Sequence, residues 1–297
     1  MVYTEVKEKN GKKYYYRVLS VRKNGKVTKR RVYLGVNLKK DLAEKEKKAD
    51  KELMLLSTLL TDDEIKELNK IKKTKDRKKE DNQSKYEAFV SLFTYDSTNI
   101  EGNTFSLQET AQLLFEGVTP RKSLREINEI TNHKEAFDFL LRYKGDLNKN
   151  FILKLHKLVT KNTLKPELKN QVGRYRVLQV YIRGTNWLPP KPSEVPKEMS
   201  YLLSWYSKNK TKLHPLILAT YFHSAFETIH PFVDGNGRVG RLLINFILHK
   251  NKYPMINILN KEKHIYYESL EESHLNGNLI PLVKFLLDLL RKEKIQF

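Results

Sequence analysis

Residues 230–241, HPFVDGNGRVGR, bring a histidine, an aspartate, an asparagine and two arginines together around three glycines. A glycine turn that opens a helix presents backbone N–H groups that lack partners inside the helix, and with the helix dipole these form an anion site. Gly235 and Gly237 let the main chain approach a phosphate closely, while Arg238 and Arg241 can hold further phosphate oxygens. The segment therefore predicts a phosphate-binding turn.

Two further side chains of the segment could act on a bound phosphate. Asp234 supplies a hard oxygen ligand, and because a carboxylate repels phosphate unless a cation bridges them, it predicts a Mg²⁺ site. His230 is the nearby group that can accept a proton at neutral pH. Bound phosphates, a metal and a base together predict phosphoryl or nucleotidyl transfer to a hydroxyl group.

Two helices are expected to position these residues, over 215–229 and 236–250, because apolar residues recur there at helical spacing. Pro231 prevents the first helix from continuing. A corner between helices, with glycines serving only the turn, is the simpler alternative, but it leaves the histidine, the aspartate and the arginines unexplained. The pattern Gly-x-Gly-x-x-Gly at 235–240 also matches a dinucleotide-binding motif, which we reject because a helical pattern precedes it instead of a strand.

The segment HPFVDGNGRVGR resembles the signature of Fic-domain proteins, His-x-Phe-x-Asp/Glu-Gly-Asn-Gly-Arg-x-x-Arg, at every defining position. The resemblance extends over roughly residues 86–290 in the order of the expected elements. It implies a mainly α, Fic-type helical bundle with a β-hairpin flap. It also implies an enzyme that moves AMP from ATP, with Mg²⁺, onto a hydroxyl side chain of a target protein.

The resemblance implies a role for each residue of the motif. His230 would deprotonate the target hydroxyl, Phe232 would anchor the loop, and Asp234 would bind Mg²⁺. A kinase-like branch of the family carries lysine at the position of Gly237. The glycine in this chain therefore favours transfer of AMP over transfer of phosphate. The phosphate groups would be held by Gly235, Asn236 and Gly237 at the α/β end, and by Arg238 and Arg241 at the β/γ end.

A second segment, STNIEGN at residues 97–103, resembles the family's autoinhibitory helix, Ser/Thr-x-x-x-Glu-Gly/Asn. Ser97 and Glu101 are one helical turn apart and therefore share a face, and Gly102 completes the pattern. The resemblance implies that Glu101 pairs with Arg241 and so keeps the γ-phosphate from binding productively. An ordinary helix end with a glycine cap is the alternative.

The segment 173–184 alternates in polarity around a glycine turn and is expected to form a hairpin. It resembles the family's flap, on which a target segment docks as an added strand. A hairpin that only covers the bundle is the alternative. His156 and His223 lie in apolar helical patterns and are interpreted as core residues or as supports of the site. Tyr266 and Tyr267 are candidates for adenine contact or for packing.

The first 37 residues differ from the rest, because Asn10-Gly11 and Asn24-Gly25 each lie between β-branched and aromatic residues. Such pairs favour two-residue hairpin turns, so a three-stranded antiparallel meander is expected. Residues 1–50 hold 16 Lys/Arg and 6 Asp/Glu, a net +10 within a total of +21. Tyrosines among basic residues suit nucleic acid, but a protein-docking module or a simple solvated sheet explains them equally well.

Composition sets the remaining expectations. The absence of cysteine excludes disulfides and thiolate chemistry, and no segment resembles a signal peptide or a membrane span, so a cytoplasmic protein without membrane contact is expected. We predict three parts: a basic meander over 1–37, a charged helical linker over 38–85, and a catalytic domain over 86–297 whose inhibitory helix lies near 86–102.

Three functional hypotheses follow. The first is an autoinhibited protein adenylyltransferase. The second is the reverse reaction, removal of AMP from a modified protein, with Glu101 orienting water at the same site. The third is a nucleic-acid-binding regulator whose Fic core senses nucleotide. Because members of the family often dimerise, a homodimer stays an open alternative.

Overall fold

The computed structural model describes residues 2–23, 26–36, 38, 42–46, 49, 59–73, 82–182, 184–185 and 187–292. Contacts within the chain define two compact units, Met1–Lys66 and Glu67–Phe297. The borders predicted at 37/38 and 85/86 stay predictions, and most of the lysine-rich stretch before residue 82 lies outside the described residues.

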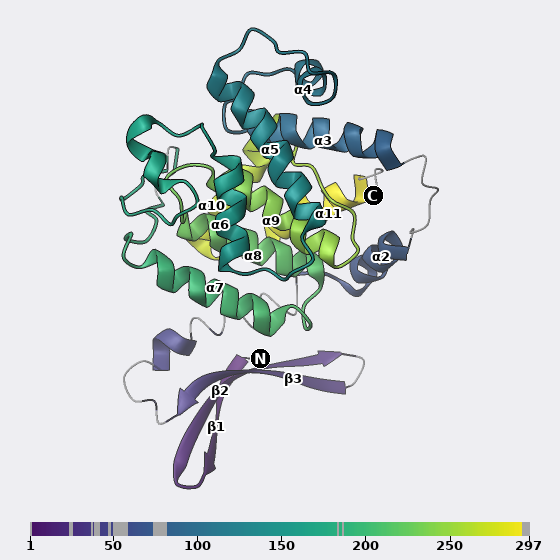
Figure 1. Cartoon of the computed structure of the whole chain (residues 1–297). Helices are drawn as coiled ribbons and strands as arrows, with labels where there is room; N and C mark the ends of the chain where they lie inside the picture. The colour runs from purple at the N-terminus through teal and green to yellow at the C-terminus, as the bar shows by residue number, and fades with distance from the viewer. Residues whose placement is uncertain are drawn as a thin grey trace. The chain divides into compact units, whose positions relative to one another are not determined.

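The first unit contains a three-stranded antiparallel sheet in the order β1-β2-β3 (Figure 1). Its strands are β1 (Val2–Lys9), β2 (Lys12–Lys23) and β3 (Lys26–Val36). At the first turn Asn10 and Gly11 have φ angles of 53° and 70°, the left-handed conformation that a tight hairpin requires. The predicted meander is confirmed, while Asn24 and Gly25 lie outside the described residues.

The second unit is helical, as predicted. Capping boxes begin two of its helices: Ser106 caps α4 with Glu109, and Ser123 caps α5 with Glu126. The principal helices are α3 (Asn82–Asn99), α4 (Leu107–Ala111), α5 (Leu124–Arg142), α6 (Lys149–Val159), α7 (Val195–Asn209), α8 (Pro215–Ile229), α9 (Asn236–Lys250), α10 (Lys263–Asn276) and α11 (Ile280–Lys292), and α2 (Asp62–Lys73) lies before them.

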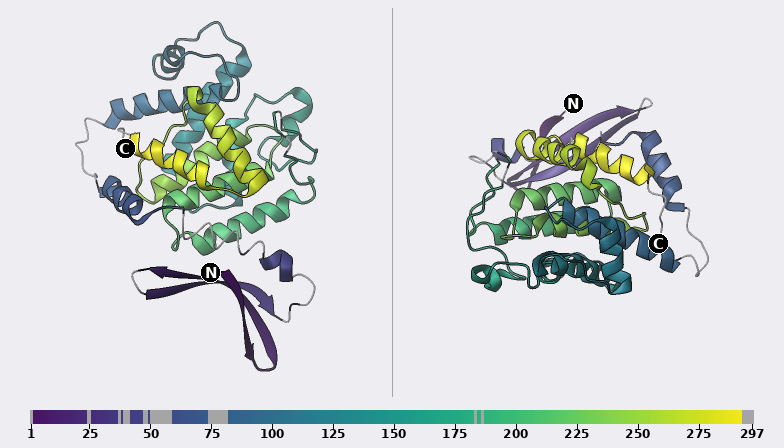
Figure 2. Two further views of the ribbon diagram at one scale, coloured as in Figure 1. Left: turned by 180° about the vertical axis from the view of Figure 1, so that it is seen from behind. Right: turned by 90° about the horizontal axis from the view of Figure 1, so that it is seen from above.

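Helix α9 forms the centre of the bundle (Figure 1). It packs against α8, α6, α5 and α3, and twelve of its residues, from Asn236 to Leu248, are buried. Seen from behind, the yellow C-terminal helices α10 and α11 cover α8 (Figure 2). Because α9 has neighbours on all sides, polar groups in its first turns are enclosed by protein.

The segment 173–184 corrects the sequence prediction, because its described residues form an irregular loop with no strand. Arg176, only 1% exposed, donates to the main-chain oxygens of Leu178 at 3.1 Å and Pro190 at 2.6 Å. The side chain of Gln179 donates to the Pro189 oxygen at 3.1 Å. The Leu178 oxygen lies within the loop, and the Pro189 and Pro190 oxygens follow it, so side-chain hydrogen bonds tie the loop to the proline segment in place of a hairpin ladder.

None of the helices in the described part of the chain combines the length and the apolar character that crossing a membrane requires.

Candidate active site

The candidate site is built around the junction of α8 and α9. Helix α8 ends at Ile229, and His230 follows in the left-handed conformation with φ 48° and ψ 62°, which is uncommon for a residue with a side chain. The His230 N–H still bonds to the Phe226 oxygen at 2.9 Å. Helix α9 begins at Asn236 after Gly235, so the predicted helix bounds on both sides of the motif are confirmed.

Asn236 fixes the loop between the two helices. Its side chain accepts from the Phe232 N–H and donates to the Phe232 oxygen, both at 2.9 Å. The buried Phe232 ring in turn stacks on the His156 ring, with centroids 3.8 Å apart. The side chain of Asn236 therefore supports the loop, and only its main chain can contribute to the predicted anion hole.

His156 supports the same loop from α6. The Gly173 N–H donates to His156 Nδ1 at 2.9 Å, so Nε2 carries the proton and donates to the Asp234 main-chain oxygen at 3.2 Å. Burial lowers the pKa of His156 to about 4, so its ring is uncharged at neutral pH. The interpretation of His156 as a supporting residue matches these contacts.

Two glycines of the motif have neighbours that leave no space for a side chain. Gly235 has φ 80°, and a Cβ there would lie 2.8 Å from the methyl group of Thr160. At Gly237 a Cβ would lie 2.2 Å from Glu101 Oε1. Both contacts are shorter than packed atoms allow. Thr160 is buried, so glycine at position 235 lets α9 begin close to the end of α6, whereas a side chain at position 237 would displace the partly exposed Glu101 carboxylate.

The structure brings Arg241 together with the predicted inhibitory residues. Arg241 is 2% exposed, and its guanidinium donates to Glu101 Oε1 at 2.8 Å, to Ser97 Oγ at 3.0 Å and to the Ser97 oxygen at 2.7 Å. Ser97 lies on α3, whereas Glu101 lies in the turn after Asn99, which ends at Gly102 with φ 98°. The shared contact therefore comes from a helix end and its turn, not from one helix face.

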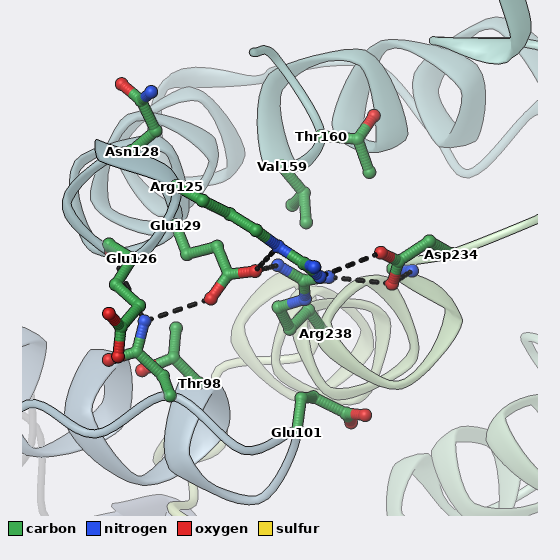
Figure 3. Close-up of polar contacts among 12 residues, drawn as sticks. Thr98, Glu101, Arg125, Glu126, Asn128, Glu129, Val159, Thr160, Asp234 and Arg238 are labelled. Carbon is green, nitrogen blue, oxygen red and sulfur yellow. Dashed lines mark hydrogen bonds and ion pairs between the residues drawn. The ribbon is translucent and has the colours of Figure 1, made fainter. Parts of the chain in front are cut away.

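Asp234 and Arg238 form a second ion pair, at 2.9 Å between Oδ1 and Nη2. Two residues of α5 join them in Figure 3: Arg125 reaches Asp234 Oδ2 at 3.5 Å, and Glu129 Oε1 lies 3.5 Å from Arg238 Nη1. Sequence reasoning did not identify Arg125 or Glu129. Their four-residue spacing indicates only that they share a helix face, and it says nothing of a motif over one hundred residues away.

Both arginines of the motif keep donors that have no hydrogen-bond partner in the described structure. These are the buried Nε of Arg238 and Nη1 of Arg241, while Nη1 of Arg238 has only the 3.5 Å ion pair with Glu129. Buried donors of this kind are costly unless an acceptor reaches them, and phosphate oxygens are suitable acceptors. The donor set therefore fits a polyphosphate.

The carboxylate of Asp234 fits Mg²⁺ in the same site. Among the described residues no group of three or more His, Cys, Asp and Glu side chains could hold a metal by itself. Mg²⁺ in phosphate sites takes one or two carboxylates and completes its shell with phosphate oxygens and water. Asp234 is therefore the carboxylate of this site that could hold Mg²⁺ together with phosphate oxygens and water.

His230 is uncharged at neutral pH. Burial lowers its pKa to about 4, although Glu101 and the Glu227 main chain act in the opposite direction. Its Nδ1 lies 3.8 Å from Glu227 Oε2, and burial raises the pKa of Glu227 to about 8. An unprotonated imidazole whose side chain is 21% exposed can accept a proton from a group that approaches from solvent.

The remaining aromatic candidates divide between packing and the surface. His223 and Tyr266 are both buried, and His223 Nε2 lies 2.7 Å from the Tyr266 hydroxyl, so this pair belongs to the core. Tyr267 is 44% exposed, and its hydroxyl lies 3.4 Å from the Ile100 oxygen, next to Glu101. Of the two tyrosines, Tyr267 is the one that a ligand could contact.

The model of the Fic/DOC family matches residues 146–248. Protein adenylyltransferase Fic of Nematostella vectensis is 33% identical over 198 residues, which cover 65% of this chain and 45% of that protein. Protein adenylyltransferase fic-1 of Caenorhabditis elegans is 33% identical over 202 residues, 66% of this chain and 38% of that protein. The chain therefore spans less than half the length of these curated relatives.

Solved structures share the fold. A Fic-domain-containing signalling protein from Bacteroides thetaiotaomicron is 29% identical with a TM-score of 0.71, over 77% of this chain and 94% of that chain. Fic-1 from C. elegans is 27% identical with a TM-score of 0.68, over 84% of this chain and 73% of that chain. With its motif, its fold and these relatives in agreement, residues 146–248 of this chain form a Fic/DOC domain.

Proposed function

We propose that this protein is an autoinhibited protein adenylyltransferase that uses ATP to modify a hydroxyl side chain of another protein. The observation that carries the proposal is the set of buried guanidinium donors on Arg238 and Arg241, which lie at the start of α9 beside the uncharged imidazole of His230. The names of the curated relatives support the same reaction.

The reaction assigns a task to each residue of the site. His230 takes the proton of the target hydroxyl, whose oxygen forms a bond to the α-phosphorus of ATP. The bond from that phosphorus to the bridging oxygen breaks, and pyrophosphate leaves with the bonding pair. Main-chain N–H groups of Gly235, Asn236 and Gly237 stabilise the charge on the phosphate, because donors fixed at a helix start need no reorganisation.

Arg238 and Arg241 hold the outer phosphates, and Asp234 binds Mg²⁺. When bound, the cation neutralises charge between the phosphate groups and the carboxylate. The guanidinium groups are held in place by buried contacts before the substrate arrives, so they orient the triphosphate for in-line attack. Mutation of each residue can test these assignments.

Glu101 would keep the enzyme at low activity. Its carboxylate contacts Arg241 at 2.8 Å, where a γ-phosphate oxygen would otherwise bind, and it is 34% exposed. A carboxylate and a phosphate compete for one guanidinium, and they repel each other at this distance. Activation therefore requires that Glu101 leave Arg241.

The loop over residues 173–184 is proposed as the docking site for the target. Its apolar side chains face solvent: Val177 is 68% exposed, Leu178 50% and Tyr181 81%. Exposed apolar residues that cluster beside a reactive site are typical of protein-interaction surfaces. Arg176 joins this loop to the His230 oxygen, so a docked segment would lie next to the base.

Removal of AMP is the second candidate, favoured by the partly exposed carboxylate of Glu101 within the same site. A carboxylate in that position could orient a water molecule toward a phosphate ester. The two reactions respond in opposite ways to Glu101→Gly, since transfer would rise and removal would fall.

Nucleic-acid binding by the N-terminal sheet is a separate candidate. Tyr16 and Tyr33 contact each other with ring centroids 5.3 Å apart, Tyr14 lies 6.5 Å from Tyr33, and Lys7 lies over Tyr16 at 5.7 Å. Aromatic rings beside cations suit single-stranded nucleic acid. Binding to DNA or RNA that falls with salt and is lost on deletion of residues 1–40 would support this role.

Intact-mass measurement tests the main proposal. The Glu101→Gly variant, incubated with ATP and Mg²⁺, is expected to gain the mass of one AMP unit on itself or on an added target. The double variant with His230→Ala is the matched control and should gain none. Absence of the adduct from Glu101→Gly, together with release of AMP from a modified protein by the wild type, would favour the reverse reaction instead.

A further inference from the structure

Arg125 lies outside the motif but touches its carboxylate. It belongs to the first turn of α5, and its Nη2 lies 3.5 Å from Asp234 Oδ2 (Figure 3). Its Nε donates to Glu129 Oε1 at 3.1 Å. The side chain is 55% exposed, so Arg125 reaches into the site from its solvent side.

Asp234 is thus held between two guanidinium groups, one on each oxygen. Arg238 contacts Oδ1 at 2.9 Å and is 2% exposed, whereas Arg125 contacts Oδ2 at the longer distance from an exposed position. A divalent cation bound to Asp234 would repel both arginines. Because an exposed ion pair is weak and Arg238 is buried, Arg125 is the group that must move away.

Glu129 limits how far Arg125 can move. The Glu129 side chain is 10% exposed, and its other oxygen, Oε2, accepts a hydrogen bond from Asn103 Nδ2 at 2.9 Å. Because Arg125 is bound to this fixed carboxylate through Nε, its Nη atoms can leave Asp234 while the guanidinium stays near the site. The released Nη atoms could then pair with the phosphate chain of a nucleotide whose cation Asp234 holds.

We propose that Arg125 is a further nucleotide-binding residue, which pairs with Asp234 in the metal-free protein and pairs with the triphosphate when a divalent cation takes Asp234. The inference rests on the proposed function, because it needs a nucleotide with Mg²⁺ at the start of α9. It predicts that the contribution of Arg125 to ATP affinity depends on the metal.

Calorimetry of ATP binding to the full chain tests the inference, with thermal stabilisation by ATP as a second readout for weak binding. All variants carry Glu101→Gly so that Arg241 is available. With Mg²⁺, Arg125→Ala is expected to weaken ATP binding by about three- to tenfold, the range for a partly exposed charged hydrogen bond. With EDTA in place of Mg²⁺, the same substitution is expected to change the affinity by less than about twofold.

Two matched variants separate this role from general electrostatics. Arg121→Ala removes an equal charge from an exposed position four residues earlier, and its small effect should be the same with and without Mg²⁺. Arg125→Lys keeps the charge but has one nitrogen in place of the guanidinium fork, so an intermediate, metal-dependent loss is expected.

Three results would overturn the inference. An equal loss of ATP affinity for Arg125→Ala with Mg²⁺ and with EDTA would show that Arg125 acts only as a long-range charge. An unchanged affinity in both conditions would show that Arg125 does not bind the nucleotide. If the Glu101→Gly parent itself binds no ATP with Mg²⁺, the proposed function fails and the inference fails with it. The first two results leave the proposed function intact, because in both cases the Glu101→Gly parent still binds ATP.

Discussion

The guanidinium of Arg176 donates a hydrogen bond of 2.8 Å from Nε to the main-chain oxygen of His230. Arg176 N–H also donates to the Pro231 oxygen at 2.9 Å. His230 has a left-handed backbone, a conformation that persists only where surrounding contacts determine it. Arg176 supplies two of those contacts and at the same time holds the loop at 173–184.

We therefore expect Arg176→Lys to slow AMP transfer without weakening ATP binding. Lysine keeps the charge but cannot reach several carbonyl groups at once, so His230 would lose its position. A displacement of about 1 Å can lower the rate about a hundredfold. Self-modification of the Glu101→Gly background and calorimetry with ATP measure the two effects. Arg174→Lys, at an exposed neighbouring position, is the control, and equal rates for both variants would contradict the role.

Ser97 is expected to contribute to inhibition beside Glu101. Ser97→Ala removes the hydroxyl that accepts from Arg241 Nε at 3.0 Å and leaves the other two contacts. The loss of one hydrogen bond to a charged group, about 1.5 kcal/mol, corresponds to about a tenfold rise in basal self-modification. Ser91→Ala, a buried change on the same helix, should leave the basal rate unchanged. A lower rate in Ser97→Ala would assign Ser97 to binding instead.

Glu227 is expected to make stability fall as the pH rises from about 4.5 to about 8. Burial raises its pKa from 4.5 to about 8, so the folded state holds a proton that the unfolded state releases above about 4.5. The associated stability is present in full below that value and is lost as the pH rises through 8. Burial lowers the pKa of His223 to about 3, so its effect on stability lies below pH 6.5.

Urea unfolding of the wild type and of Glu227→Gln isolates this group. As the pH rises from about 6 to about 9, the unfolding free energy of the wild type should fall by more than about 1 kcal/mol relative to that of Glu227→Gln. Glutamine retains the size of the side chain and has no proton to lose. A difference that stays constant over this range would show that the Glu227 carboxyl is ionised throughout.

Gly240 is expected to tolerate no side chain. A Cβ there would lie 2.3 Å from Glu227 Oε1 and 2.8 Å from the His223 ring, and these groups are buried. Gly240→Ala should lower the unfolding free energy by about 1–3 kcal/mol, the range for overpacking. Thermal unfolding measures it, and adding Glu227→Ala should recover part of the loss. An unchanged melting temperature would mean that α8 and α9 can separate at this point.

The flap shows where local pattern misleads. Alternating residues on both sides of a glycine predict a hairpin, but that pattern reports only which side chains could share a face of a sheet. Within this segment Arg176 instead donates to the Leu178 oxygen and Gln179 to the Val180 oxygen. The position of the buried Arg176 side chain depends on the residues that pack around it, and these lie outside the segment. The pattern of residues within the segment therefore cannot predict which carbonyl groups Arg176 will bind.

Local sequence determined the elements of this protein and the chemistry of its motif. Helices α8 and α9 and the first turn of the meander follow from apolar spacing, Pro231 and glycine placement, because these effects act within a few residues of the chain. Arg125 and Glu129 meet Asp234 and Arg238 only because α5 packs against α9. That contact depends on the packing of distant apolar faces, so only the tertiary structure decided which charges surround the proposed metal ligand.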